Sequence, residues 1–125
     1  MEYLLTIPGR LDNLNDYISA ERSHRMKGAA MKESNEAIVH SAILTQLRHA
    51  RITLPVRMEY LWVEKNARRD KDNISSFGRK VIQDALVKSH VLVNDDWKHV
   101  DSFSDDFIVD AKNPRIEVRI IEIGE

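Results

Sequence analysis

The sequence contains no cysteine among its 125 residues. Disulfide bonds and thiolate zinc sites are therefore excluded, both as supports of the fold and as carriers of chemistry. Any metal ion must be bound through oxygen or imidazole ligands. The Walker A, GxSxG and GxGxxG patterns are also absent, so the sequence gives no support for a nucleotide-driven motor, a serine hydrolase or a dinucleotide enzyme.

Long apolar runs are missing as well. None approaches the roughly 20 residues that cross a bilayer, so no membrane partner is expected. The opening MEYLLTIPG begins with an acid and lacks the basic flank and the long apolar stretch of a secretory signal, which leads us to expect a cytoplasmic protein. With 42% apolar and 31% charged residues, the composition is typical of one globular domain, which we place at residues 1–125.

The sequence also has no surplus of positive charge, because the formal net charge is -1. Domains that bind a phosphate backbone usually carry a basic surplus, so the total argues mildly against a nucleic-acid partner. The distribution of charge matters more, since acids gather near the C-terminus and a basic surface upstream can coexist with a neutral total. The basic side chains that we expect to contact DNA are Arg22, Arg25, Lys27, Lys32, Arg68, Arg69 and Lys71.

Hydrophobic periodicity predicts an α+β fold. Apolar residues alternate in the predicted strands and recur at helical spacing in the predicted helices. In chain order, these elements are a strand over 3–7, a helix over 32–50, a strand over 56–62, a helix over 74–89 and a strand over 116–120. Residues 10–30 are polar and basic, and we expect a helical turn there followed by an exposed arm. Both main helices need a sheet to cover their apolar faces, which predicts two helices packed on a mixed β-sheet.

The stretch RRDKDN, residues 68–73, carries the most chemical information. On an extended backbone, Asp70 and Asp72 would point to the same side, and their carboxylates would lie within a few ångströms of each other. Such carboxylates repel unless a cation lies between them, and Mg²⁺ usually binds through one or two carboxylates plus phosphate oxygens of the substrate. Alternatively, Asp72 or Asn73 simply caps the helix that follows, and both interpretations can hold together.

A second acidic pair, Asp95 and Asp96, follows a brief apolar run at 91–93. Neighbouring residues on an extended chain face opposite ways, so only one of the two can readily join the first pair of acids. The alternative is an ordinary polar turn. On the predicted helix, Lys80 leans back towards the N-terminus and can approach the carboxylates, unless it is a solvated lysine at the edge of the polar face.

Four other residues attract less functional weight. The rings of Trp62 and Trp97 are expected to pack in the core or at its rim rather than to stack on bases. Arg79 is expected at the surface. Among the five histidines, which show no recognised metal-ligand spacing, His99 is retained as a phosphate contact because it stands three residues from an acid.

Taken together, these residues resemble the RusA family of Holliday junction resolvases, small phage-type endonucleases that act on four-way branched DNA. The resemblance rests on RRDKDN at 68–73, KVIQDAL at 80–86 and VNDDW at 93–97. A looser match to LNDYISAER and to the closing strand extends it over most of the chain. The resemblance implies a mixed α/β homodimer that uses Mg²⁺, with Mn²⁺ as a substitute, to nick opposite strands symmetrically in recombination and repair.

The resemblance also implies particular site residues. The family's essential acids and its essential lysine fall on Asp70, Asp72, Asp96 and Lys80. The segment ISSFGRKVIQ, residues 74–83, looks longer than in the best-known member, so the position of the lysine depends on where the gap is placed. Asp95 is retained as a substitute metal ligand.

The chemistry of these residues agrees with that implication. Carboxylates can hold one or two Mg²⁺ ions, which activate water for in-line attack on the phosphorus, while Lys80 neutralises charge developing on the phosphate. Two other functions stay open at this point. One is a non-catalytic DNA-binding dimer, in which the acids are caps and turns. The other is a Mg²⁺-dependent phosphohydrolase that acts on linear or flap DNA or on nucleotides.

Overall fold

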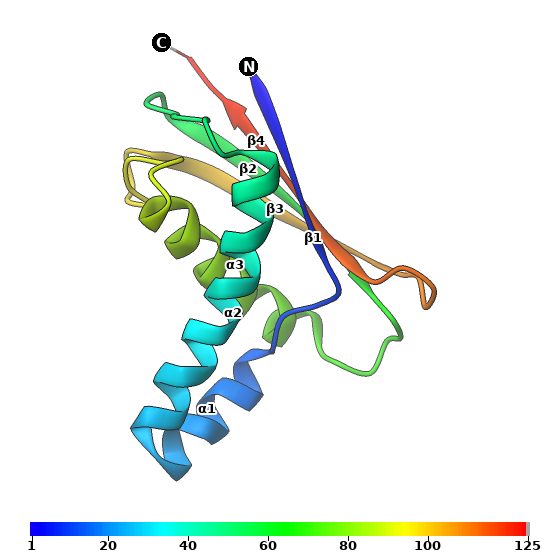
Figure 1. The fold of residues 1–125 in the computed structure, drawn as a ribbon. Coiled ribbons are helices and arrows are strands. Elements are labelled where there is room, and N and C mark those ends of the chain that lie inside the picture. The colour runs from blue at the N-terminus through cyan, green and yellow to red at the C-terminus, as the bar shows by residue number, and fades with distance from the viewer. Residues whose placement is uncertain (125) are drawn as a thin grey trace.

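A mixed four-stranded β-sheet forms the base of the fold in the computed structural model, which describes residues 1–124 (Figure 1). The elements are β1 (Glu2–Pro8), α1 (Leu14–Ser23), α2 (Arg25–Gln46), β2 (Val56–Glu64), α3 (Lys71–Lys88), β3 (Val100–Val109) and β4 (Arg115–Glu122). The strand order is β1-β4-β2-β3, in which β2 and β3 run parallel and the other neighbours run antiparallel. The predicted α+β class with a mixed sheet is confirmed.

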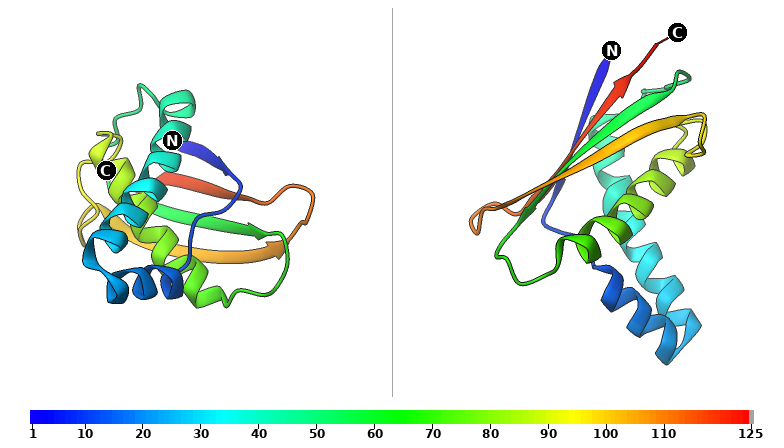
Figure 2. Two further views of the ribbon diagram at one scale, coloured as in Figure 1. Left: turned by 60° about the horizontal axis from the view of Figure 1, so that its bottom comes forward. Right: turned by 180° about the vertical axis from the view of Figure 1, so that it is seen from behind.

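The helices lie on one side of the sheet (Figure 2). Helices α2 and α3 lie side by side across this face, while α1 packs against α2 and extends with it beyond the sheet. The segment after residue 20 is exposed as predicted, but it is helical rather than an irregular arm, because α1 continues to Ser23 and α2 begins at Arg25. The two helices meet at His24, whose extended backbone breaks the helix and whose Nδ1 accepts a hydrogen bond from the amide of Met26.

The core lies between the sheet and the helices, as the periodicity predicts. In β2 the inward residues Met58, Tyr60 and Trp62 are at most 1% exposed. The predicted apolar faces of the two main helices are buried as well, including Val39 in α2 and Val81 in α3. No helix within residues 1–124 is long and apolar enough to cross a lipid bilayer.

Strand β3 is the element that the periodicity misses. The parallel register with β2 places Phe103, Asp105 and Phe107 on the side that faces the helices. Asp105 can occupy an inward position because the Trp62 indole donates a hydrogen bond to Oδ1, at 2.8 Å, and Arg79 forms an ion pair with Oδ2. The expectation that Arg79 is a surface residue is therefore wrong, since it joins α3 to β3.

Helix α3 approaches the sheet closely at Gly78. A Cβ atom at this position would lie 2.5 Å from Cη2 of Trp62, a separation that side chains do not tolerate. Trp62 is buried and is held by its hydrogen bond to Asp105, so it has little freedom to move away. The absence of a side chain at Gly78 therefore sets how close α3 comes to β2.

We predict that Gly78→Ala lowers the free energy of unfolding by about 1–2 kcal/mol. Overpacking costs roughly 1–3 kcal/mol, which exceeds the gain of up to about 1 kcal/mol in helix propensity. The control is Ser41→Ala at an exposed position of α2, where the change should stay within about 1 kcal/mol. Urea denaturation measures both, and equal stability of the two variants would contradict the close packing.

Candidate active site

The first turn of α3 carries the first two candidate acids. Asp70 is the N-cap residue of α3, although its side chain makes no capping hydrogen bond, and Asp72 lies inside the first turn. The extended backbone that we expected under both acids is therefore wrong, because a helix separates residues i and i+2 by about 200° around its axis. The expectation that Asp72 or Asn73 caps the helix is also wrong, because α3 begins at Lys71 and Asp70 is its N-cap. Both acids are exposed at the end of α3 where the helix dipole favours negative charge.

Lys80 connects α3 to the second acidic segment. Its Nζ lies 3.6 Å from Oδ2 of Asp95 and 3.1 Å from Oδ1 of Asp84. The hydrogen bond with Asp84, with further contributions from the charges of Asp84 and Asp95, raises the pKa of Lys80 above its ordinary value, so the side chain stays a cation. Lys80 stands eight residues after Asp72, about 12 Å along the helix axis, and its amine reaches Asp84 one turn further on. The expectation that it leans back to the acids of the first turn is therefore wrong.

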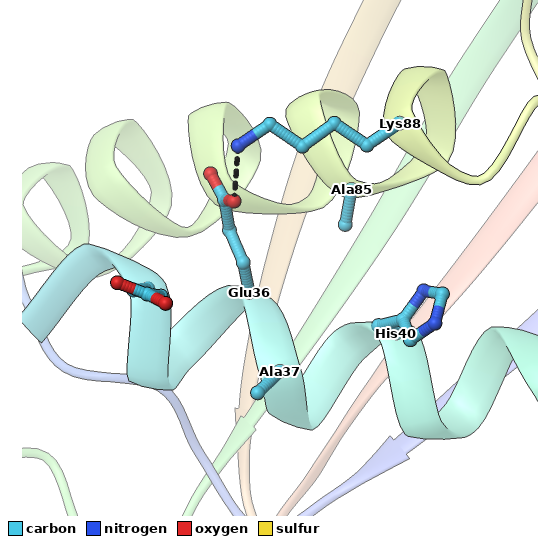
Figure 3. A pocket seen from close by; sticks show the side chains of 6 residues that line it. Glu36, Ala37, His40, Ala85 and Lys88 are labelled. Carbon is cyan, nitrogen blue, oxygen red and sulfur yellow. Dashed lines mark hydrogen bonds and ion pairs between the residues drawn. The ribbon is translucent and has the colours of Figure 1, made fainter. Parts of the chain in front are cut away.

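A row of alternating charges joins α2 to α3 and ends at Lys80. Lys32 Nζ lies 2.8 Å from Oδ2 of Asp84 and 3.8 Å from Oε2 of Glu36, and Lys88 Nζ lies 2.6 Å from Oε1 of Glu36. Figure 3 shows the last of these contacts across the pocket between the two helices. We call Lys88, Glu36, Lys32, Asp84 and Lys80 the ion-pair row. Because Asp84 contacts both Lys32 and Lys80, the row holds Lys80 on the side of α3 that meets Asp95.

Asp96 makes its contacts within its own loop. Its Oδ1 accepts a hydrogen bond from the backbone amide of His99, at 3.0 Å, and lies 2.6 Å from Nδ1 of the His99 ring. The hydrogen bond from the His99 side chain, together with backbone hydrogen bonds and the charge of His99, holds the pKa of Asp96 below its ordinary value. The structure thus brings Asp95 to Lys80, whereas Asp96 is paired with His99.

The basic candidates fall into two groups. Arg69 binds Glu64 through two hydrogen bonds of 2.8 and 2.9 Å and donates a third to the carbonyl oxygen of Leu11, so it joins segments of the fold. Lys32 belongs to the ion-pair row. The candidates whose residues are exposed are Arg22, Arg25, Lys27, Arg68 and Lys71. The first three lie where α1 meets α2, and the last two flank Asp70 at the start of α3.

A hollow lies beside the start of α3. It has a volume of about 390 Å³ and is lined by Asp70 and Lys71 of this segment and by Phe107 at the end of β3. The Lys71 ammonium lies 5.7 Å from the centre of the Phe107 ring, a cation–π distance. An anionic group that enters this hollow would meet the ammonium group of Lys71. The neighbouring carboxylate of Asp70, which makes no capping hydrogen bond, could bind a cation beside it.

The sequence predicted the wrong environment for Trp97, and the role of Asp84 was not predicted from it. Trp62 is buried as expected, but Trp97 is 97% exposed, so the expectation that it packs in the core or at its rim is wrong. Asp84 stands four residues after Lys80, the spacing of an ion pair on one helix face, and that spacing was the available signal.

Within residues 1–124, no three histidine, aspartate or glutamate side chains form a group that could hold a metal ion. A scan against models of known protein families gives no match, and a search of curated proteins finds no similar protein. The candidate site consists of two exposed acids at the positive end of α3, a lysine bound by carboxylates, and an acidic loop that contacts the lysine.

We predict that Asp84→Asn lowers the free energy of unfolding by about 1–2 kcal/mol at pH 6, because it removes charged partners of Lys32 and Lys80. Burial alone raises the pKa of Asp84, but the hydrogen bonds and charges of the two lysines outweigh it and hold the pKa below its ordinary value. The stability that this carboxylate contributes is therefore complete above the unfolded pKa of about 3.9 and is lost as the pH falls through the folded pKa.

Urea denaturation at pH 6 and at pH 3 measures this effect. The wild-type protein should lose more stability between these pH values than the Asp84→Asn variant. The matched control is Asp106→Asn, at an exposed residue of β3 on the sheet face away from the helices, which should behave as wild type. An unchanged pH dependence in Asp84→Asn would contradict the role given to the ion-pair row.

Proposed function

We propose that this chain is a Mg²⁺-dependent endodeoxyribonuclease of the RusA type that resolves four-way DNA junctions by paired, symmetric nicking. The observation that carries the proposal is the contact between Lys80 and Asp95, which joins α3 to a second acidic segment. The same helix presents Asp70 and Asp72 at its first turn. One helix thus carries Asp70 and Asp72 at its start and, at Lys80, a contact with the loop acid Asp95.

The donor chemistry fits Mg²⁺. The candidate ligands are carboxylates, the hard oxygen donors that Mg²⁺ and Mn²⁺ prefer. The carboxylate of Asp70 is not used for capping, so it is free of that competing role. Asp70 and Asp72 would hold the ion with Asp96 or Asp95 from the loop. When bound, the ion supplies activation of water and stabilisation of the departing oxygen.

The protein's own residues supply the remaining tasks. Lys80 stays protonated and neutralises negative charge that develops on the scissile phosphate. Arg68 and Lys71 flank Asp70 and bind the adjoining phosphates, because both are exposed beside it. The basic residues where α1 meets α2 lie farther along the helical side and follow the DNA backbone. Arg69 and Lys32 are left out of this set, since both are engaged in ion pairs within the fold.

A homodimer completes the proposal. A four-way junction must be cut on two strands, and one active site addresses one of them. A twofold dimer presents two identical sites that are related by the same symmetry as the paired strands. Symmetric nicks follow from this arrangement.

We predict that Asp70→Asn and Asp72→Asn each lower junction cleavage at least a hundredfold and change junction affinity less than threefold. The carboxylates serve the metal, whereas the affinity comes from basic residues that contact phosphates. Cleavage of a labelled four-way junction in Mg²⁺ measures the first quantity, and gel-shift titration in Ca²⁺ measures the second. Asp106→Asn is again the control, and it should cut at the wild-type rate. Parallel loss of binding and cleavage in the Asp70 and Asp72 variants would contradict the assignment.

The same assay separates the other functions. A non-catalytic DNA-binding dimer would bind the junction without producing paired nicks. A nuclease for linear or flap DNA would cut those substrates at least as fast as the junction. Asp95→Asn and Asp96→Asn then identify the third metal ligand. The variant that lacks this ligand should lose cleavage to the same extent as Asp70→Asn.

A further inference from the structure

Trp97 stands almost entirely in solvent, with 97% of its surface exposed. Tryptophan is usually well buried, because its large ring gains more from burial than almost any other side chain. The second tryptophan, Trp62, follows this rule and is 1% exposed. The stability of the fold therefore does not explain why a tryptophan occupies position 97.

Contacts on both sides of Trp97 hold the loop that carries it. On the N-terminal side of Trp97, Asp95 contacts Lys80 of α3 at 3.6 Å. Two further contacts join Asp96 to residues that follow Trp97. The carbonyl oxygen of Asp96 accepts a hydrogen bond from the amide of Val100, at 3.0 Å, and the carboxylate of Asp96 binds His99. The backbone is thus fixed to α3 and to the start of β3, and the ring is presented outwards from it.

The surroundings of the ring indicate the kind of partner that it fits. A tryptophan offers at most about 250 Å² of contact, whereas a stable protein interface buries roughly 800 Å² on each partner. Residues 93–99 expose one other large apolar side chain, Val93, and the rest of the exposed loop is polar or charged. A small, flat, isolated apolar surface among polar groups suits a nucleobase, which has a flat apolar face and polar edges.

We propose that Trp97 stacks on an unpaired base of the DNA substrate and thereby positions the adjoining phosphate beside Lys80. The identity of the substrate rests on the proposed function. Bases inside a duplex are stacked on their neighbours and are not available, so the ring selects DNA whose bases are exposed, as at a branch point or in a single strand. The loop acid Asp95 and the ring of Trp97 are two residues apart, which places base recognition next to the candidate chemistry.

Phe103 provides a matched comparison. It is 51% exposed, but the Arg79 guanidinium lies over its ring, 4.4 Å from the centre, so one face already has a partner within the fold. Phe103→Leu therefore removes an exposed aromatic ring near Trp97 in sequence without removing the proposed platform.

Tryptophan fluorescence tests the proposal directly, because Trp97 is exposed and Trp62 is buried. The probes are a single-stranded oligothymidylate, a four-way junction and a fully paired duplex, each titrated in Ca²⁺ to prevent cleavage. We expect the first two to quench Trp97 and the duplex to quench it far less. Trp97→Phe should lose the quenching and keep its affinity within about threefold, since a phenyl ring also stacks. Trp97→Ala should bind the junction about tenfold more weakly, and Phe103→Leu should resemble wild type.

The proposal would be overturned by unchanged fluorescence at saturating DNA or by wild-type junction affinity in Trp97→Ala. A third contradicting result is coverage of Trp97 by a second copy of the chain, which sedimentation would reveal as loss of the dimer in Trp97→Ala. The proposed function fails separately. Quenching without nicking in Mg²⁺ would contradict the nuclease assignment and leave base stacking in place. Nicking without quenching would contradict base stacking and leave the nuclease assignment in place.

Discussion

The close packing of Gly78 against the ring of Trp62 fixes α3 on the sheet, and the arrangement of the candidate site depends on that position. The buried indole donates a hydrogen bond to Asp105, which Arg79 also binds, so β2, β3 and α3 form one unit. A larger residue at position 78 would move α3 outwards. Lys80 would then lose its contact with Asp95 in the loop that precedes β3.

The ion-pair row supplies the second constraint on the site. Charges at a partly buried helix interface are costly unless each has a partner, and here every member of the row contacts an opposite charge. The row ends where Lys80 meets Asp95, so the same contacts that hold α2 against α3 also present a cation to the acidic loop. The loop in turn holds Trp97 outwards, which links the proposed base contact to the packing of the helices.

The sequence was sufficient to predict the elements whose burial follows a regular spacing, such as the inward face of β2 from Met58 to Trp62. Strand β3 could not be predicted in this way, because its inward Asp105 is satisfied by partners that lie far away in the chain. The spacing singled out Asp70 and the acids that follow it, and the resemblance gave them roles. The sequence could not show that α3 begins directly after Asp70, nor that Trp97 is exposed, because the start of a helix and the burial of a side chain depend on tertiary contacts.

The proposed nuclease requires that the first turn of α3 and the loop before β3 bind one metal ion. Paramagnetic broadening of backbone amide signals by Mn²⁺ tests it most directly, since the effect reports which residues lie near the bound ion. At substoichiometric Mn²⁺, signals from residues 70–73 and 94–97 should broaden together, and Asp70→Asn should abolish both effects. Broadening of one segment alone, or broadening that persists in Asp70→Asn, would contradict a metal site shared by the two segments.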